Sequence, residues 1–286
     1  MKIKEIKNKL NTIRSMVSLH ESGKGYQIAD PDIPEEYQLM TRVTTILNRG
    51  VPKRQLAEWI LRQESEYFSD EFRRRLRTNM SYEETVTMAL AVKEESTTAS
   101  QRIRDTAADW GSTIHNLIER LSYDSSVFVP EEFSCAVNSW YSWLSESKMS
   151  ILATEQPLYF YDEETHVRYC GTADLIALTE DKENIVIADY KSGKRIYATH
   201  SLQNSAYSMA LKQLLSDLDY TGQPRCMVVK LPKTTDEKFQ VRESSNVPWQ
   251  EEVFYAMAEN QLLVKSWESN RKKWLPLKKE KVTSDA

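Results

Sequence analysis

Two neighbouring apolar segments each contain an aspartate, and this feature restricts the fold more than any other. The segment GTADLIAL carries Asp174 between apolar residues, and NIVIADYK places Asp189 at the end of an apolar run. Short runs rich in valine, isoleucine and leucine, bounded by polar turns, are typical of β-strands. A buried carboxylate costs free energy unless a cation or a hydrogen-bond donor meets it. The chain therefore needs a sheet core in which both acids find such a partner.

The second half of the chain reads as a sheet with helices. The segments ILATEQPLYFY, VRYCGTADLIAL and NIVIADYK predict three consecutive strands, separated by the polar turns DEET and EDKEN. A helix is expected over 199–217, followed by a fourth strand in RCMVVKLP, a possible fifth in KFQVR, and a closing helix over 250–268. These elements predict a small mixed sheet in which one helix crosses over after the third strand.

The first half of the chain is predicted to be mainly helical. Apolar residues at helical spacing indicate an amphipathic helix over 2–19, and glycines and prolines indicate a loop over 21–37. Residues 43–48 fit either a short strand or the start of a helix, and helices are expected from 53 to 121 and from 131 to 147. The fold class is therefore α+β or α/β, with a mixed sheet flanked by helices and a helical N-terminal region.

Four parts of the chain are expected from this pattern. They are an N-terminal helix and linker at 1–40, a helical region covering the site at 41–150, a core of sheet and helices at 151–270, and a basic, then polar tail at 271–286.

Composition excludes several classes of protein. Three scattered cysteines argue against a disulfide framework or a cysteine-built metal site. No apolar run approaches the roughly 20 residues of a membrane span, and the N-terminus lacks the apolar core of a secretory signal. We therefore expect a cytoplasmic protein with no membrane partner. The net charge of -4 does not indicate nucleic acid, but a local basic face is enough to bind it.

Lys191 follows Asp189 by two residues, so both side chains are expected on one face of a strand, with Tyr190 on the other. Two neighbouring carboxylates repel each other unless a metal ion joins them, and carboxylate oxygens are the ligands that Mg²⁺ prefers. A nearby ammonium group can orient the attacking water or stabilise charge on a phosphate. Asp174, Asp189 and Lys191 thus supply the parts for metal-assisted phosphodiester hydrolysis. A plain ion pair is the alternative, because a short D-x-K motif often matches by chance.

Three further patterns accompany this motif. Gly111, His115 and Glu119 are spaced four residues apart on a predicted helix, where they share one face. Glu155 lies inside an apolar strand, where a carboxylate is unusual unless it has a structural or functional role. Gln203 and Tyr207 lie one turn apart on the helix after the D-x-K strand. Each pattern also has an ordinary structural explanation, such as a satisfied core histidine or polar residues at a helix edge.

The ordered set of motifs resembles the RecB-like branch of the PD-(D/E)-x-K nucleases. The set is G-x-x-x-H-x-x-x-E, E-x-P, G-T-A-D-L-I, I-A-D-Y-K-S-G-K and Q-x-x-x-Y, and the resemblance extends over residues 41–212. The branch includes nuclease domains of bacterial recombination exonucleases and the mitochondrial genome maintenance exonuclease, and many phage-encoded exonucleases carry similar runs. The resemblance implies a restriction-endonuclease-like core. It also implies a role in DNA recombination, repair or degradation, with a possible recombination partner protein.

The resemblance assigns expected roles to the matching residues. His115, Asp174, Asp189 and the Tyr190 carbonyl would bind the metal ion, and Lys191 would activate or orient water. Glu119 and Glu155 would lie behind these ligands or hold a second ion, and Gln203 and Tyr207 would brace the site and meet the DNA backbone. Histidine is a soft ligand for Mg²⁺, so Mn²⁺ is expected to work as well or better. Ala173 replaces the family's proline, and Asp189 stands where glutamate also occurs; both changes keep the chemistry.

Some relatives hold an iron–sulfur cluster through four cysteines, and this chain has three at unsuitable spacing, so no such cluster is expected. A Walker-type phosphate loop is also absent from the sequence.

Positive residues are the candidates for DNA contact. They are the dense run Arg73, Arg74, Arg75 and Arg77, and the segment Ser192, Lys194 and Arg195 beside the D-x-K motif. For the arginine run, a solvated helix face is the competing explanation. The main functional hypothesis is a DNA exonuclease that acts on strand ends, with single-stranded ends favoured. The alternatives are an endonuclease on the same core, a non-catalytic DNA-binding recombination module, and a structural protein with buried ion pairs.

Overall fold

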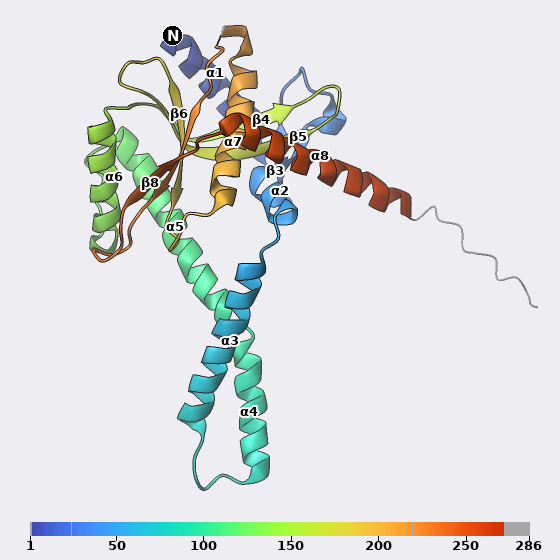
Figure 1. The fold of residues 1–286 in the computed structure, drawn as a ribbon, viewed down its shortest axis with the longest axis vertical. Helices are drawn as coiled ribbons and strands as arrows, with labels where there is room; N and C mark the ends of the chain where they lie inside the picture. The colour runs from blue at the N-terminus through green and yellow to red at the C-terminus, as the bar shows by residue number, and fades with distance from the viewer. Residues whose placement is uncertain (1, 24, 219, 272–286) are drawn as a thin grey trace, which may run out of the picture.

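The computed structural model describes residues 2–23, 25–218 and 220–271. Apart from Arg271, which ends the last helix, the predicted tail at 271–286 lies outside the described residues. A mixed sheet between helices forms the body of the molecule, and a helical hairpin projects from it (Figure 1). The predicted fold class is confirmed.

The sheet has eight strands within the described part of the chain, where five were expected. They are β1 (Val17–Leu19), β2 (Gly25–Ile28), β3 (Leu39–Arg42), β4 (Ser150–Tyr161), β5 (Arg168–Leu178), β6 (Ile185–Lys191), β7 (Arg225–Lys230) and β8 (Gln240–Glu243). Their order is β1-β2-β3-β5-β6-β7-β8, with β4 paired to β5. β4, β5 and β6 run antiparallel as consecutive neighbours. The predicted crossover is confirmed, because helix α7 (Ala198–Leu214) leads from β6 to β7, which runs parallel to β6.

Helices cover both faces of the sheet. One face packs against α1 (Ile3–Met16), α2 (Val43–Gly50), α7 and α8 (Val247–Arg271), and the other against α5 (Ala99–Tyr123) and α6 (Ser134–Ser147). The strands are apolar on both sides for this reason: Ile176 and Ile187 contribute to the first cluster, and Leu175 and Ala188 to the second. Three short 3₁₀ helices complete the described elements: η1 (Glu35–Tyr37), η2 (Glu131–Phe133) and η3 (Ser216–Leu218).

Helices α3 (Arg54–Arg75) and α4 (Tyr82–Ser96) form an antiparallel hairpin, which we call the arm, and it extends away from the sheet (Figure 1). Ser81 caps α4 by a capping box: its hydroxyl accepts from the backbone of Glu84, whose side chain accepts from the backbone of Ser81. The arm packs on the beginning of α5, and residues 101–109 of that helix are exposed. α5 thus connects the arm to the body.

The N-terminal predictions were wrong in part. The expected helix over 2–19 ends at Met16, and Val17–Leu19 forms β1; the expected loop over 21–37 contains β2. Val17 continued the helical apolar spacing, but its pairing with Ile28 places it in a third small apolar cluster. Residues 43–48, which fitted either a strand or a helix start, lie in α2. Within the described residues, no helix combines the length and apolarity that crossing a bilayer requires.

Candidate metal centre

A gap in the sheet lies beside Asp174. On one edge of β5, β6 pairs from Leu178 to Leu175, and β3 pairs with Tyr169 and Cys170. The residues between, Gly171–Asp174, have no strand neighbour on that edge among the described strands. The last pair of the β5–β6 ladder is Leu175 with Ala188, so the next position in register brings Asp174 opposite Asp189. Strands β5 and β6 therefore stop pairing at the positions of Asp174 and Asp189.

In strand β4, the regular alternation of side chains between the two faces of the sheet reverses at Glu155. Thr154 and Gln156 are two residues apart and should share a face. Instead, Thr154 Oγ1 donates to the hydroxyl of Tyr123 on α5 (3.1 Å), and Gln156 Nε2 donates to the carbonyl of Leu10 on α1 (3.0 Å). These helices cover opposite faces of the sheet. Glu155 has a φ of 43°, in the left-handed region, and this residue absorbs the reversal.

In strand β5, the alternation of side chains reverses at Asp174, the residue opposite Glu155. Pairing of Thr154 with Leu175 and of Gln156 with Ala173 sets Glu155 opposite Asp174. Ala173 packs in the cluster under α1 and α7, whereas Leu175 packs in the cluster under α5. Neighbours two apart thus lie on opposite faces in both strands. This paired reversal brings the carboxylates of Glu155 and Asp174 out at one place, against α5.

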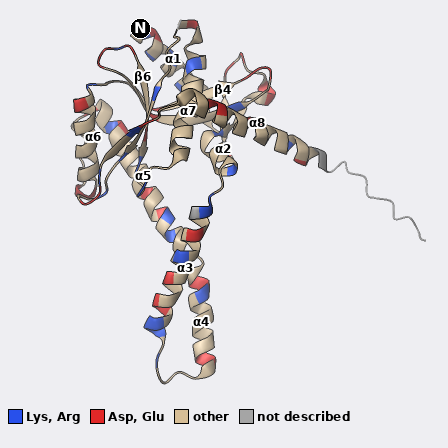
Figure 2. Cartoon of the chain, in the orientation of Figure 1, with Lys and Arg blue, Asp and Glu red and all other residues tan. Residues whose placement is uncertain are grey.

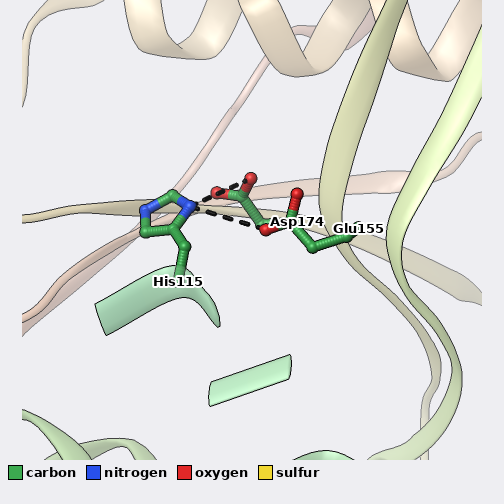
Figure 3. A group of neighbouring side chains, drawn as sticks. All are labelled: His115, Glu155 and Asp174. Atoms are coloured by element: carbon green, nitrogen blue, oxygen red, sulfur yellow. Dashed lines mark ion pairs between the residues drawn. The ribbon is translucent and has the colours of Figure 1, made fainter. Parts of the chain in front are cut away.

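His115 on α5 meets these two carboxylates (Figure 3). Its Nδ1 atom lies 3.5 Å from Asp174 Oδ1 and 3.6 Å from Glu155 Oε1. The other ring nitrogen, Nε2, lies 3.2 Å from the carbonyl oxygen of Tyr190. One ligand atom from each of His115, Glu155 and Asp174 fits within 4.8 Å of the others, as a metal site requires.

Asp189 and Lys191 lie on the other side of Asp174. Lys191 Nζ donates to Asp189 Oδ1 (2.7 Å) and lies 2.6 Å from Oδ2, and it reaches Gln203 Oε1 at 3.4 Å. Gln203 Nε2 in turn donates to the hydroxyl of Tyr207 (3.1 Å). The backbone N–H of Tyr190 donates to Asp174 Oδ2 (2.6 Å). The side chain of Tyr190 points to the opposite face, where its hydroxyl accepts from Trp140. Four predicted residues, Asp189, Lys191, Gln203 and Tyr207, thus form one connected chain.

Burial and charge set the protonation of the centre. Burial alone lowers the pKa of His115, but Asp174 and Glu155 outweigh it and raise that pKa to about 10. Burial raises the pKa of Asp189 to about 6, although Lys191 opposes this shift. For Asp174, His115 and Lys191 outweigh burial and lower the pKa. The metal-free centre therefore holds protonated His115 and Lys191 beside ionised Asp174 at neutral pH.

The residues present fit a divalent ion. Asp189 is 1% exposed, and the charge of neighbouring Asp174 adds to burial in raising its pKa. Two buried carboxylates that repel each other form an unfavourable arrangement, which a divalent cation between them would relieve. The donors are carboxylate oxygens and one imidazole nitrogen, a set suited to Mg²⁺ or Mn²⁺. Donation of the His115 Nε2 proton to the Tyr190 carbonyl would leave Nδ1 free for the ion.

Metal affinity is expected to rise with pH. An ion bound through His115 must displace the proton that the two carboxylates hold there, because only neutral imidazole is a ligand. Below the His115 pKa of about 10, the dissociation constant for Mn²⁺ should fall about tenfold per pH unit. Titration calorimetry between pH 7 and 9, in buffers of different protonation enthalpy, measures both the affinity and the released proton. In His115→Gln this pH dependence should be lost; an unchanged pH dependence would place the ion elsewhere.

The positive φ of Glu155 predicts unequal effects of two substitutions. Glu155→Gly removes the left-handed strain, whereas Glu155→Val introduces a β-branched residue that rarely adopts this conformation. We expect Glu155→Val to be less stable than Glu155→Gly by about 2 kcal/mol in denaturant unfolding with EDTA, and both to bind Mn²⁺ more weakly. The same pair at Lys182, which has a φ of 59° on the surface, should differ in stability without changing metal affinity. Equal stability of the two Glu155 variants would contradict the strain.

Glu119 lies in a shallow pocket next to the centre. The pocket has a volume of about 360 Å³ and is lined by Ser112, His115, Asn116, Glu119 and Glu155. Burial and the charge of Glu155 raise the pKa of Glu119. The predicted proximity of Glu119 and Glu155 to the centre agrees with this geometry.

The predicted DNA contacts lie in two separate places. Arg73, Arg74, Arg75 and Arg77 are at the far end of the arm, remote from the centre (Figures 1 and 2). Arg74 pairs with Glu71, and Arg75 with both Glu71 and Glu95, so their charges are largely neutralised. Lys194 and Arg195 are exposed just beyond β6. A Cβ atom on Gly111 would lie 3.2 Å from Ser192 Oγ, so this glycine admits the loop that carries Ser192.

Two residues that hold the reversal of β4 were missed from the sequence. Arg14 on α1 donates to the carbonyl of Thr154 (2.5 Å), and buried Gln156 donates to the carbonyl of Leu10. These contacts lie on either side of Glu155. The sequence feature that could have indicated Gln156 is a polar residue inside an apolar strand, directly after Glu155.

Similarity to known proteins shows the family of this chain. The sequence model described as the PD-(D/E)XK nuclease superfamily matches residues 26–276. No curated protein matches the chain. Among solved structures, the crystal structure of SSO0001 is similar at 15% identity with a TM-score of 0.30. That match covers 46% of this chain and 57% of that chain, and it supports no argument about function. From the family match, which extends over most of its length, the chain belongs to the PD-(D/E)XK nuclease superfamily.

Proposed function

We propose that this protein is a metal-dependent DNA exonuclease that hydrolyses phosphodiester bonds from single-stranded ends. The observation that carries the nuclease activity is the meeting of His115, Glu155 and Asp174 beside the buried Asp189–Lys191 pair. Membership of a nuclease superfamily supports the same conclusion. The choice of strand ends rests on the ordered motifs of the RecB-like branch, which include phage-encoded and mitochondrial exonucleases.

The side chains of the centre have different roles in hydrolysis. A bound divalent ion would supply Lewis acidity to the phosphate and lower the pKa of water. His115, Asp174, Asp189 and Glu155 would hold that ion, and Glu119 lies behind them. Lys191 orients the attacking water, since its ammonium group is fixed by Asp189 and Gln203. Tyr207 braces Gln203, and Ser192, Lys194 and Arg195 contact the substrate backbone just beyond Lys191.

The proposed domain roles follow from this assignment. Residues 151–270 form the nuclease core, and residues 41–150, with α5 reaching into the centre, form the region past which a strand end is guided. Such an enzyme would act in DNA recombination, repair or degradation in the cytoplasm, either of a cell or of the host of a phage.

A test with linear and circular DNA separates the possibilities. The purified protein is incubated with a 5′-labelled linear single strand and a closed circular single strand, each with Mg²⁺, Mn²⁺ or EDTA. Loss of the linear strand alone, prevented by EDTA, supports the exonuclease. Cleavage of the circle moves the assignment to an endonuclease on the same core. Binding of DNA without any cleavage would favour a non-catalytic recombination module.

A further inference from the structure

Arg42 stands at the end of the gap opposite the metal centre. It is the last residue of β3 and pairs with Cys170, where the paired edge of β5 ends. Asp174 lies four residues further along β5, a distance of about 13 Å along the strand. Arg42 and Asp174 thus mark the two ends of the unpaired edge Gly171–Asp174.

The guanidinium group of Arg42 has donors without acceptors. Its Nε atom is shielded from solvent and has no hydrogen-bond partner. Among the described residues, no carboxylate lies within ion-pair distance of Arg42, in contrast to Arg75 and Arg225, which are paired. Buried polar groups in native proteins are nearly always satisfied, so an orphaned charged donor indicates a missing acceptor.

Tyr26 on β2 holds Arg42 in place. The guanidinium carbon of Arg42 lies 5.6 Å from the centre of the Tyr26 ring, and the Tyr26 hydroxyl lies 3.3 Å from Thr172 Oγ1. Thr172 precedes Asp174 by two residues on β5. A guanidinium over an aromatic ring keeps its edge donors free for a planar, charged acceptor.

Further cations lie at the same edge of the sheet, on the face of β3 opposite to Arg42, because Thr41 and Arg42 are consecutive strand residues. Lys265 on α8 donates to Thr41 Oγ1 at 3.3 Å, one residue before Arg42. Burial lowers the pKa of Lys265, and neighbouring Arg49 and Arg168 lower it further. Within the part of the chain that the structure describes, none of these three cations has a carboxylate partner. Unpaired cations gathered in a chain of net charge -4 favour a polyanion.

We propose that Arg42 binds a phosphate group of the nucleic-acid strand that the metal centre holds. The choice of ligand rests on the proposed function, and the site itself rests on the unpaired donors. An arginine fork matches two phosphate oxygens. The phosphate is either an internal phosphodiester or the phosphate at the strand's end, and the experiment below distinguishes these sources.

Binding of a labelled single-stranded oligonucleotide is measured in EDTA, so that no cleavage occurs, over a range of salt concentrations. Arg42→Met should bind about tenfold more weakly, and the slope of log affinity against log salt should fall by about 0.7, the loss of one phosphate contact. The control is Arg225→Met at the start of β7: Arg225 donates twice to the Glu243 carboxylate, at 2.7 Å each, so its donors already have acceptors. Its affinity and salt slope should not change. Arg42→Gln repeats the test with a polar side chain if Arg42→Met does not fold.

Two oligonucleotide series identify the phosphate. One replaces single internal phosphates by uncharged methylphosphonate, and the other lacks the terminal phosphate. The modification that weakens the wild type but not Arg42→Met marks the bound group. An Arg42 variant that folds and keeps the wild-type affinity and salt slope would overturn the proposal. Mn²⁺ affinity of Arg42→Met should equal that of the wild type. If the wild type binds DNA through Arg42 but never cleaves it, the phosphate site stands and the proposed nuclease activity fails.

Discussion

Replacing Lys191 with methionine is expected to slow phosphodiester cleavage by about 10³-fold while Mn²⁺ binding persists. The ammonium group of Lys191 contacts Asp189 and Gln203, and it is absent from the three-residue cluster that fits a metal ion. Methionine keeps most of the side-chain volume and removes the charge and its donors. The reaction therefore loses the group that orients water, and the ion keeps its ligands. Single-turnover cleavage and calorimetric Mn²⁺ titration measure the two quantities separately.

Lys212 on α7 supplies a matched control. Its Nζ atom lies 2.5 Å from Glu251 Oε2, so Lys212→Met also breaks an ion pair with a largely buried carboxylate. This variant should lose stability, because Glu251 is left without its cation, and keep its cleavage rate. If Lys212→Met slowed cleavage as much as Lys191→Met, general loosening of the fold would explain both effects. If Lys191→Met cleaved DNA at the wild-type rate, the assigned role of Lys191 would be wrong.

The core of the sheet could be predicted because the sequence patterns that indicate its strands are local. The runs around Asp174 and Asp189 are apolar on both faces and short, and the segment of α7 between two such runs has the length of a helix. The alternation of β6 also placed Asp189 and Lys191 together, as the structure has them. Local periodicity was therefore sufficient for the order of β4 to β7 and for half of the centre.

Long-range pairing explains what the sequence could not predict. β1 to β3 are three or four residues long and take their conformation from each other and from β5, so propensity alone left Val17–Leu19 in a helix. The gap beside Asp174 depends on where β3 and β6 stop pairing with β5. The reversal at Glu155 contradicts strand alternation, and only the contacts of Gln156 and Thr154 reveal it. Sequence identified Glu155 as unusual without giving the backbone conformation that makes it so.

Replacing Asp174 with asparagine is expected to weaken Mn²⁺ binding by more than about 100-fold and to reduce cleavage to background. Loss of an outer hydrogen-bond partner of a metal ligand already costs about 10- to 100-fold in affinity, and a charged ligand should cost more. Asparagine can still accept the Tyr190 N–H, which Asp174 Oδ2 accepts at 2.6 Å, so the backbone should hold. His115 also loses the carboxylate that most raises its pKa, so its proton should leave at lower pH. The pH dependence of residual metal binding should weaken accordingly.

Asp162→Asn is the control for this change. Asp162 likewise accepts a backbone N–H, from Glu164, and a side-chain donor, the hydroxyl of Tyr255, but it lies in the turn after β4. Its metal affinity and cleavage should match the wild type. Wild-type Mn²⁺ affinity in Asp174→Asn would show that the ion lies outside this cluster. Loss of the ion in both Asp174→Asn and Lys191→Met would mean that the Asp189–Lys191 pair shapes the metal site as well as the water. Loss in Asp174→Asn alone would separate the two tasks: binding of the ion depends on Asp174 on the reversed strand β5, and Lys191 on the regular strand β6 acts on water.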